Sequence, residues 1–129
     1  MNNEDRKVVS TDKAPQAIGP YSQGIESGCL LFLSGQLGLI PATGEFVKGG
    51  IEEQTHQALS NLKSIIESYG RVMSNVVKTT VFLKNMEDFP KMNAVYATFF
   101  EKDPPARSTV EVAALPKHGL VEIEAIVKS

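Results

Sequence analysis

Cysteine, histidine and arginine are scarce in this sequence, and tryptophan is absent. The single cysteine, Cys29, has no partner for a disulfide within the chain. Together with the two histidines, His56 and His118, it shows none of the spacings typical of a metal site, so we predict no metal. No apolar run is long enough to cross a membrane. The sequence therefore disfavours disulfide-stabilised, metal-bound and membrane-spanning classes of protein.

Neither positive nor negative charge is in large excess. The formal net charge is -2 and the isoelectric point is near 5.7. Most nucleic-acid-binding proteins carry a large basic surface, and this balance argues against one. We therefore do not expect nucleic acid as a partner.

Chain length indicates one domain, residues 1–129. A chain of this size buries roughly two-thirds of the surface that its unfolded form exposes, which is enough for one hydrophobic core. The N-terminal segment 1–10 is charged and polar, and it lacks the apolar core of a secretory signal. We therefore expect a cytoplasmic protein.

The pattern of apolar and turn-forming residues predicts an α+β fold, with two helices on one face of a mostly antiparallel sheet. Two apolar runs, 21–25 and 29–34, flank a turn at 27–28 and predict a β-hairpin. Apolar residues then recur at helical spacing over 51–69, and Gly70 is placed to end that helix.

The second half of the chain predicts one further helix and three strands. The β-branched run 76–83 is typical of a strand, and Asp88 and Pro90 suit the start of the second helix. Two final runs, 107–112 and 120–127, alternate as strands. The buried stripe of the second helix is predicted to consist of Met92, Val95, Tyr96, Phe99 and Phe100.

The second face of the sheet is predicted to be covered by another subunit. Two helices cover only one face of a sheet. In the runs 29–33 and 76–83, however, apolar residues occupy both alternating sets. A solvated antiparallel face would be polar at every second position, so this pattern indicates an interface.

Alternation in the last two strands separates apolar from charged side chains. Val110 and Val112 share one face of the first strand, while Arg107 and Thr109 point the other way. If the apolar sets face the helices, Arg107 and Glu122 lie on the predicted interface. A planar guanidinium suits bidentate binding of a carboxylate or phosphate. The alternative is a structural salt bridge from Arg107 to a glutamate, across the sheet or the interface.

Three other residues have both a functional and a structural interpretation. Gly35 lets the backbone approach a ligand closely, or it marks a bend or bulge. Tyr21 combines an apolar ring with a polar tip, as most packing tyrosines do. Cys29 begins an apolar run, where a thiol packs as a small hydrophobe, so we expect it in the core.

Five segments of the chain carry a family resemblance. They are Ala17-Ile18-Gly19-Pro20-Tyr21-Ser22-Gln23-Gly24, Leu33-Ser34-Gly35-Gln36, Val77-Lys78-Thr79-Thr80-Val81-Phe82, Pro105-Ala106-Arg107-Ser108-Thr109-Val110-Glu111-Val112 and Val121-Glu122-Ile123-Glu124-Ala125. The chain resembles the RidA family, also known as YjgF/UK114, from about Ala14 to Val127.

The resemblance implies a chorismate-mutase-like α+β protomer and a homotrimer with three ligand sites in clefts between neighbouring subunits. It also implies a reactive intermediate deaminase, which acts without a cofactor. Such an enzyme converts 2-iminopropanoate and 2-iminobutanoate to the 2-oxo acids and releases ammonia. Its substrates arise from enamines made by pyridoxal-phosphate-dependent dehydratases.

Site residues are implied position by position. Arg107 matches the family's carboxylate-binding arginine, and Glu122 matches the acid that positions or activates the attacking water. Thr109 departs from the pattern, because well-known members carry cysteine there. The residues implied to line the site with Arg107 and Thr109 are Tyr21, Ser34, Gly35 and Asn93.

Two other functions compete with deamination. A noncatalytic protein that binds or senses 2-oxo acids would use the same cleft. Ribonuclease activity or inhibition of translation has also been associated with family members, but the acidic balance of this chain disfavours it.

Overall fold

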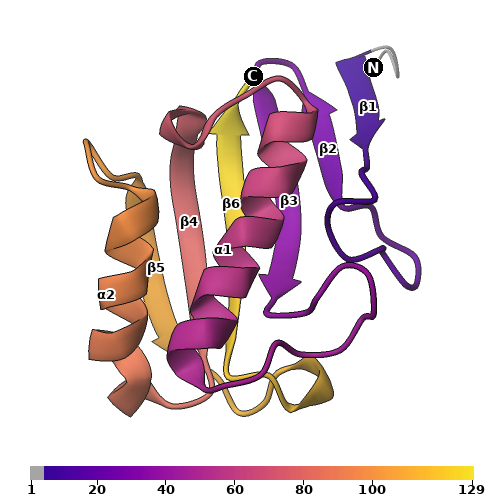
Figure 1. Ribbon diagram of the computed structural model, residues 1–129. Helices are drawn as coiled ribbons and strands as arrows, with labels where there is room; N and C mark the ends of the chain where they lie inside the picture. Colours follow the sequence, from indigo (N-terminus) through magenta and orange to yellow (C-terminus); the bar gives the residue numbers. More distant parts are fainter. Residues whose placement is uncertain (1–4) are drawn as a thin grey trace.

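The computed structural model describes residues 5–129, which form one six-stranded sheet and two α-helices (Figure 1). The strands are β1 (Arg6–Val9), β2 (Gly24–Ser27), β3 (Leu30–Leu37), β4 (Val76–Leu83), β5 (Ala106–Glu111) and β6 (Val121–Lys128). The helices are α1 (Ile51–Ser68) and α2 (Phe89–Phe99). The strand order is β1-β2-β3-β6-β4-β5, and only the pair of β4 and β5 is parallel.

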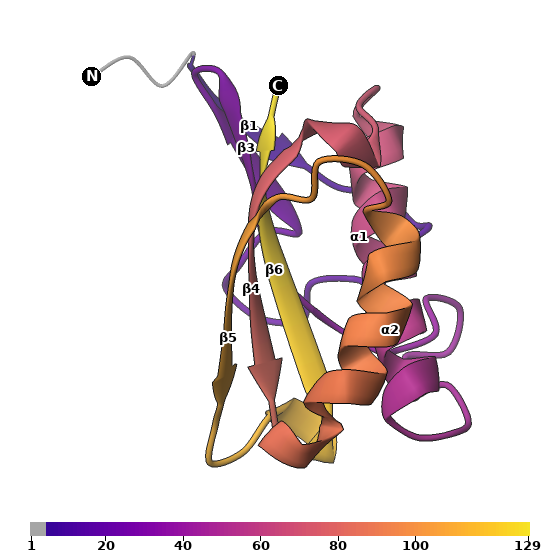
Figure 2. The same ribbon diagram turned by 90° about the vertical axis from the view of Figure 1, so that its left-hand side faces the viewer.

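Both helices lie on the same face of the sheet, as predicted (Figure 2). The strands β3 and β4 are each antiparallel to β6, which lies between them, so the chain crosses from β3 to β4 through α1. It crosses again from β4 to β5 through α2, in the same direction along the sheet. Crossovers of one hand that proceed in one direction place their helices on one face. The prediction of an α+β fold is confirmed.

The hydrophobic core lies between the helices and the sheet. Leu59, Ile65 and Ile66 of α1 are fully buried, as are Val81 and Ile123 in the middle of the sheet. The predicted end of α1 is confirmed, since Gly70 adopts φ 76° directly after the helix cap. Within the described residues, no helix is both long enough and apolar enough to cross a membrane.

The predicted hairpin is present as β2 and β3, but the prediction for Cys29 was wrong. Residues 28 and 29 form the turn, with Gly28 at φ 61°, so β3 begins one residue after the cysteine. Cys29 is exposed instead of buried. The apolar residues that follow Cys29 belong to β3, whereas Cys29 itself lies in the turn, where its side chain is exposed.

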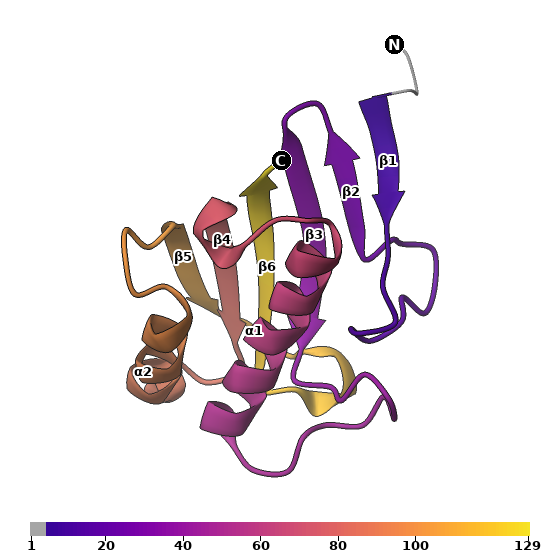
Figure 3. The same ribbon diagram turned by 45° about the horizontal axis from the view of Figure 1, so that its top comes forward.

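The strand β1 was not predicted. It is a short edge strand that pairs antiparallel with β2 (Figure 3). Only Val9 of its four residues is buried. A strand with one buried residue gives no alternating pattern over four or more positions, which explains why the sequence did not reveal it.

The second face of the sheet carries no helix, and we call it the open face. Paired residues share a face of a sheet, so the pairs of Val8 with Ile25 and of Phe32 with Ile126 place apolar side chains there. Val8 is 63% exposed and Phe32 is 42% exposed. The open face of one copy therefore exposes a row of large apolar side chains.

A β-bulge explains why β4 is apolar in both alternating sets. Its pairing with β6 shifts between Val76 and Lys78. Val76 and Val81 are therefore both buried although they are five residues apart, and Val77 is 45% exposed. By sequence position alone, Val77 falls in the same alternating set as Val81, and this expectation of a shared face is wrong because the bulge breaks the alternation.

Candidate active site

The residues predicted to carry the chemistry lie on opposite faces of the sheet. Arg107 on β5 pairs with Thr79 on β4, which pairs on its other side with Ala125 on β6. Paired residues point to the same face, and side chains alternate along a strand. Glu122 is three residues from Ala125, so it points to the other face. One copy of the chain therefore keeps Arg107 and Glu122 apart.

The predicted orientation of β5 was wrong. Thr109 pairs with the fully buried Val81, so Thr109 and Arg107 face the helix layer. Val110 points to the open face and is 42% exposed. An apolar set marks the core side in a central strand, but β5 is the outermost strand. There the helix layer ends, and the long side chain of Arg107 reaches the surface beside α2.

Arg107 is held by one face of α2. Its Nη1 donates a hydrogen bond of 2.8 Å to Oδ1 of Asn93. Its guanidinium carbon lies over two aromatic rings, 4.7 Å from the centroid of Tyr96 and 5.4 Å from that of Phe89. A hollow of about 370 Å³ adjoins the arginine and is lined by Asn93, Tyr96, Ala97, Phe100, Pro104 and Pro105. We call Arg107 and the three α2 side chains that contact its guanidinium, Phe89, Asn93 and Tyr96, the arginine group.

Sequence reasoning missed two members of the arginine group as possible site residues. Phe89, Asn93 and Tyr96 occupy positions i, i+4 and i+7 of α2. Residues at this spacing share one helix face. Tyr96 was assigned only to the buried stripe, and Phe89 was not considered. Phe89 lies four residues before Asn93 and Tyr96 lies three residues after it, and this helical spacing is the signal that could have identified both as neighbours of the site.

The alternative of a salt bridge across the sheet does not describe Arg107 within one copy. Its side-chain hydrogen-bond partner among residues 5–129 is a neutral amide oxygen. The nearest glutamate along its own strand, Glu111, accepts a hydrogen bond of 2.8 Å from the backbone of Met86. The guanidinium thus keeps further N–H donors for a ligand or another copy.

Four of the other predicted residues meet around a second hollow, on the open face. It measures about 620 Å³ and is lined by Tyr21, Ser34, Gly35 and Glu122. Leu37, Leu39 and Pro116 add apolar walls, and Lys117 and Glu124 add charges. We call Tyr21, Ser34, Gly35 and Glu122 the glutamate group. The structure brings these four predicted residues together.

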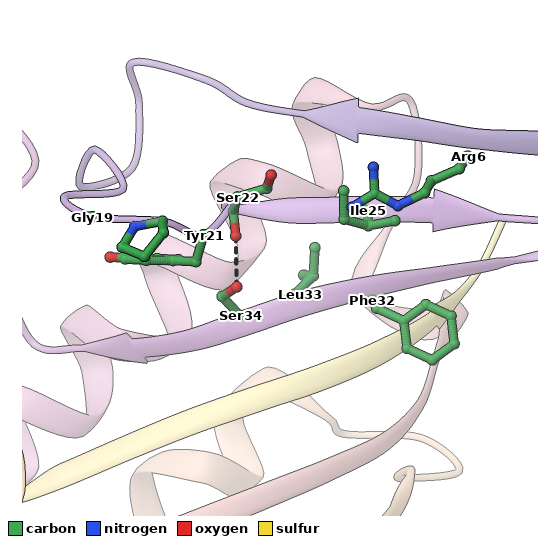
Figure 4. A pocket seen from close by; sticks show the side chains of 9 residues that line it. Arg6, Gly19, Tyr21, Ser22, Ile25, Phe32, Leu33 and Ser34 are labelled. Atoms are coloured by element: carbon green, nitrogen blue, oxygen red, sulfur yellow. Dashed lines mark hydrogen bonds between the residues drawn. The ribbon is translucent and has the colours of Figure 1, made fainter. Parts of the chain in front are cut away.

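Tyr21 and Ser34 also line a neighbouring hollow of about 570 Å³ (Figure 4). The hydroxyl of Ser34 donates a hydrogen bond of 2.6 Å to the backbone carbonyl of Ser22. This bond ties β3 to the loop that carries Tyr21. Tyr21 is 53% exposed, so the structural interpretation as a packing residue does not hold within one copy.

The carboxyl group of Glu122 is half-buried, and its surroundings favour the protonated form. Burial raises its pKa above the usual 4.5, and the negative charge of Glu124 raises it further.

Gly35 leaves room for the carboxyl group of Glu122. A β-carbon added at residue 35 would lie 2.8 Å from Cδ of Glu122. The interpretation of Gly35 as a bulge residue is confirmed, because it lies at an irregularity of β3. Its close approach to a ligand stays a prediction.

Thr109 is the least explained of the predicted residues. It lies two residues after Arg107 on the same face of β5, and it is not among the residues that line either group's hollow. Its hydroxyl oxygen is shielded from solvent and has no hydrogen-bond partner among residues 5–129. A buried hydroxyl without a partner is costly, so a donor or acceptor from outside this copy would stabilise it.

No cluster of three or more residues among 5–129 has the arrangement of a metal site. His56 is exposed on α1, with its ring edge-on to Phe99 at a centroid distance of 5.3 Å. His118 is exposed in the turn that precedes β6. The absence of a metal from the working protein stays a prediction.

Comparison with known families gives one match that covers most of the chain. The model of a family described as Endoribonuclease L-PSP matches residues 11–129. The match includes every predicted site residue, from Tyr21 to Glu122.

Relatives of this chain include proteins with different names. A RutC family protein from Pyrococcus horikoshii is 53% identical and covers 94% of this chain and 96% of its own. A 2-iminobutanoate/2-iminopropanoate deaminase from Mus musculus is 50% identical and covers 98% of this chain and 93% of its own. The crystal structure of E. coli TdcF with bound serine is 40% identical, covers 95% of this chain and 98% of its own, and superimposes with a TM-score of 0.91.

Proposed function

Because the chain belongs to the Endoribonuclease L-PSP family, which is also called the RidA (YjgF/UK114) family, we propose that it is a hydrolytic deaminase of 2-imino acids. Its substrates are 2-iminopropanoate and 2-iminobutanoate, and its products are the 2-oxo acids and ammonia. A relative at 50% identity carries the name of this activity. The observation that carries the proposal is a guanidinium with unused donors on one face and a half-buried carboxyl group on the other.

The site is built by two copies of the chain in a homotrimer. The arginine group of one copy meets the glutamate group of its neighbour, since the sheet separates the two groups within each copy. Exposed apolar residues of the open face support this arrangement, because such a row is stabilised when another subunit covers it. The two halves then enclose a small substrate between subunits.

Arg107 anchors the substrate by its carboxylate. A guanidinium binds a carboxylate through two parallel N–H donors, and each charge-assisted hydrogen bond contributes about 1.5 to 3 kcal/mol when shielded. Such an anchor fixes the imine carbon relative to the glutamate of the neighbouring copy. Orientation of this kind replaces an encounter in solution by a prearranged contact.

Glu122 transfers protons during hydrolysis. As a carboxylate it accepts a proton from water while the water oxygen forms a bond to C2 of the protonated imine. Glu122 then returns the proton to the nitrogen of the resulting carbinolamine, and the C–N bond breaks as a lone pair of the hydroxyl oxygen forms the C=O bond. The hydroxyl proton passes to the departing ammonia, so the products are the 2-oxo acid and ammonium. A pKa raised by burial suits a group that must both accept and donate a proton. The step needs only water and proton transfer, so we propose no cofactor.

The experiment that tests the proposal generates 2-iminobutanoate in the assay. A threonine dehydratase supplies the enamine from threonine, and the decay of the imine is followed with and without this protein. Accelerated decay with formation of 2-oxobutanoate and ammonia supports the deaminase. Unchanged decay together with saturable 2-oxobutanoate binding selects the noncatalytic binding protein instead.

Ribonuclease activity is the third candidate, after the noncatalytic binding protein, and the family description names it. Cleavage of RNA that is lost in Arg107→Ala, with an affinity that falls steeply with salt, would favour it. The net charge of -2 disfavours RNA as a partner and so favours the deaminase over the ribonuclease.

The cytoplasmic location is part of the proposal and is tested by fractionation.

Replacing Gly35 with alanine is expected to lower kcat for 2-iminobutanoate about 10- to 100-fold, because the new methyl group displaces the carboxyl group of Glu122. The flexible glutamate side chain moves away from the methyl group, so the melting temperature changes little. Gly50→Ala is the matched control, since a β-carbon there meets no atom within 4 Å. Wild-type kcat in Gly35→Ala would show that the position of Glu122 is unimportant.

A further inference from the structure

The aromatic side chains of the arginine group have a role that the proposed function does not yet include. We propose that Tyr96 and Phe89 are positioning residues that fix the plane of the Arg107 guanidinium and so present its N–H donors to the substrate carboxylate. This inference rests on the proposed function, because it concerns the anchor of the same site. Thr79 supports the arrangement by holding Tyr96.

Two aromatic rings and one amide oxygen contact the guanidinium of Arg107. Its central carbon lies over the Tyr96 ring at 4.7 Å and over the Phe89 ring at 5.4 Å. A guanidinium has five N–H donors, and the face of an aromatic ring offers no oxygen acceptor that would occupy one of them. Asn93 accepts one donor from Nη1. The remaining donors stay available for a carboxylate.

Tyr96 is itself fixed to the sheet. Tyr96 is only 4% exposed, and its ring packs against that of Phe100 at a centroid distance of 4.7 Å. Its hydroxyl is hydrogen-bonded to Oγ1 of Thr79 at 2.7 Å. Thr79 is also the residue of β4 that pairs with Arg107. Thr79 therefore holds both the backbone of Arg107, by strand pairing, and the Tyr96 ring that contacts its guanidinium, by a hydrogen bond.

An edge strand makes such support necessary. β5 pairs with a neighbour on one side only, and Arg107 is partly exposed. A free arginine side chain samples many rotamers, and binding a ligand then costs the entropy of ordering it. Aromatic contacts that order the side chain in advance lower this cost. Their loss weakens substrate binding while leaving the chemical step at Glu122 intact.

Kinetics of Tyr96→Leu test the inference. We expect KM for 2-iminobutanoate to rise about 5- to 30-fold, with kcat within about twofold of wild type, because uniform binding is lost. Tyr96→Phe keeps the ring and loses the bond to Thr79, so most of the affinity is retained. Met92→Leu is the control for structure: Met92 is fully buried on the same helix, and its replacement lowers the melting temperature without changing KM.

Phe89→Leu keeps the inference testable if Tyr96→Leu does not fold. Phe89 is only partly buried, and its replacement is expected to raise KM about two- to fivefold. A folded Tyr96→Leu or Phe89→Leu protein with wild-type KM would overturn the inference.

Failure of the proposed function gives a different result. If the wild type does not accelerate imine hydrolysis, the same variants are compared by calorimetry for binding of 2-oxobutanoate. Weaker binding by Tyr96→Leu would then support the positioning role without catalysis. Unchanged binding, or no binding by the wild type, would overturn it.

Discussion

Replacing Glu122 with glutamine is expected to lower kcat for 2-iminobutanoate about 100- to 10,000-fold, the usual range for loss of a general acid–base. Glutamine has nearly the same shape, so it still fits beside Gly35, but it neither accepts a proton from water nor returns one to nitrogen. KM is expected to change little, because Arg107 holds the substrate carboxylate. Steady-state kinetics with the dehydratase-coupled assay measure both constants.

Stability measurements show whether Glu122→Gln is still folded. Since burial raises the pKa of Glu122 in the folded protein, the charged form is disfavoured there. Wild type and variant should be equally stable below the usual pKa of 4.5, and the wild type should become the less stable of the two as pH rises through the folded pKa. The variant is thus expected to melt higher than wild type at neutral pH.

A matched control is Glu67→Gln, which changes an exposed carboxyl group on α1 far from the open face. This variant should keep wild-type kcat. Near-normal kcat in Glu122→Gln would remove the glutamate from the mechanism, whatever the effect on stability.

Arg107→Ala is expected to lower kcat/KM for 2-iminobutanoate about 100-fold or more. Two charge-assisted hydrogen bonds to the carboxylate are lost, and each tenfold change corresponds to about 1.4 kcal/mol. Arg107→Lys should also be impaired, because an ammonium is a point charge that neither binds in two parallel contacts nor stacks on Tyr96 in the same way. The measurement is kcat/KM with the size of the assembly checked by light scattering.

Arg71→Ala is the control for Arg107. Arg71 also lies over an aromatic ring, that of Tyr69 at 5.9 Å, but it follows the end of α1 and belongs to neither group. Its replacement should leave kcat/KM unchanged. Full activity in Arg107→Lys would mean that planar, bidentate binding of the carboxylate is not required.

Local patterns of the sequence predicted most of the fold. The stripe of apolar residues over 51–69 corresponds to α1, and the β-branched run corresponds to β4. Both elements lie in the middle of the layers, where burial imposes a clear periodicity. Most of the misplaced features lie at the margins, where burial is incomplete: β1 and β5 are edge strands, and Cys29 occupies a turn. The exception is Val77, which lies at a bulge of β4.

The site was predicted as a set of residues but not as an arrangement. Resemblance supplied Arg107, Glu122 and their neighbours, and the structure gathers them into two groups. Their separation follows from the register of β4 with β5 and β6, which pairs Arg107 with Thr79 and Glu122 with Phe82. Register depends on long-range strand pairing, and a shift of one residue reverses every side chain. No local pattern in the sequence contains that information.

Complementation between two inactive variants tests the shared site most directly. Arg107→Ala and Glu122→Gln chains are co-expressed with different tags, and assemblies that contain both are isolated. In a trimer that contains both kinds of chain, one of the three sites combines an intact arginine group with an intact glutamate group from the neighbouring copy, so about one third of wild-type activity should return in the isolated assemblies. Mixed assemblies as inactive as either parent would contradict a site built by two copies.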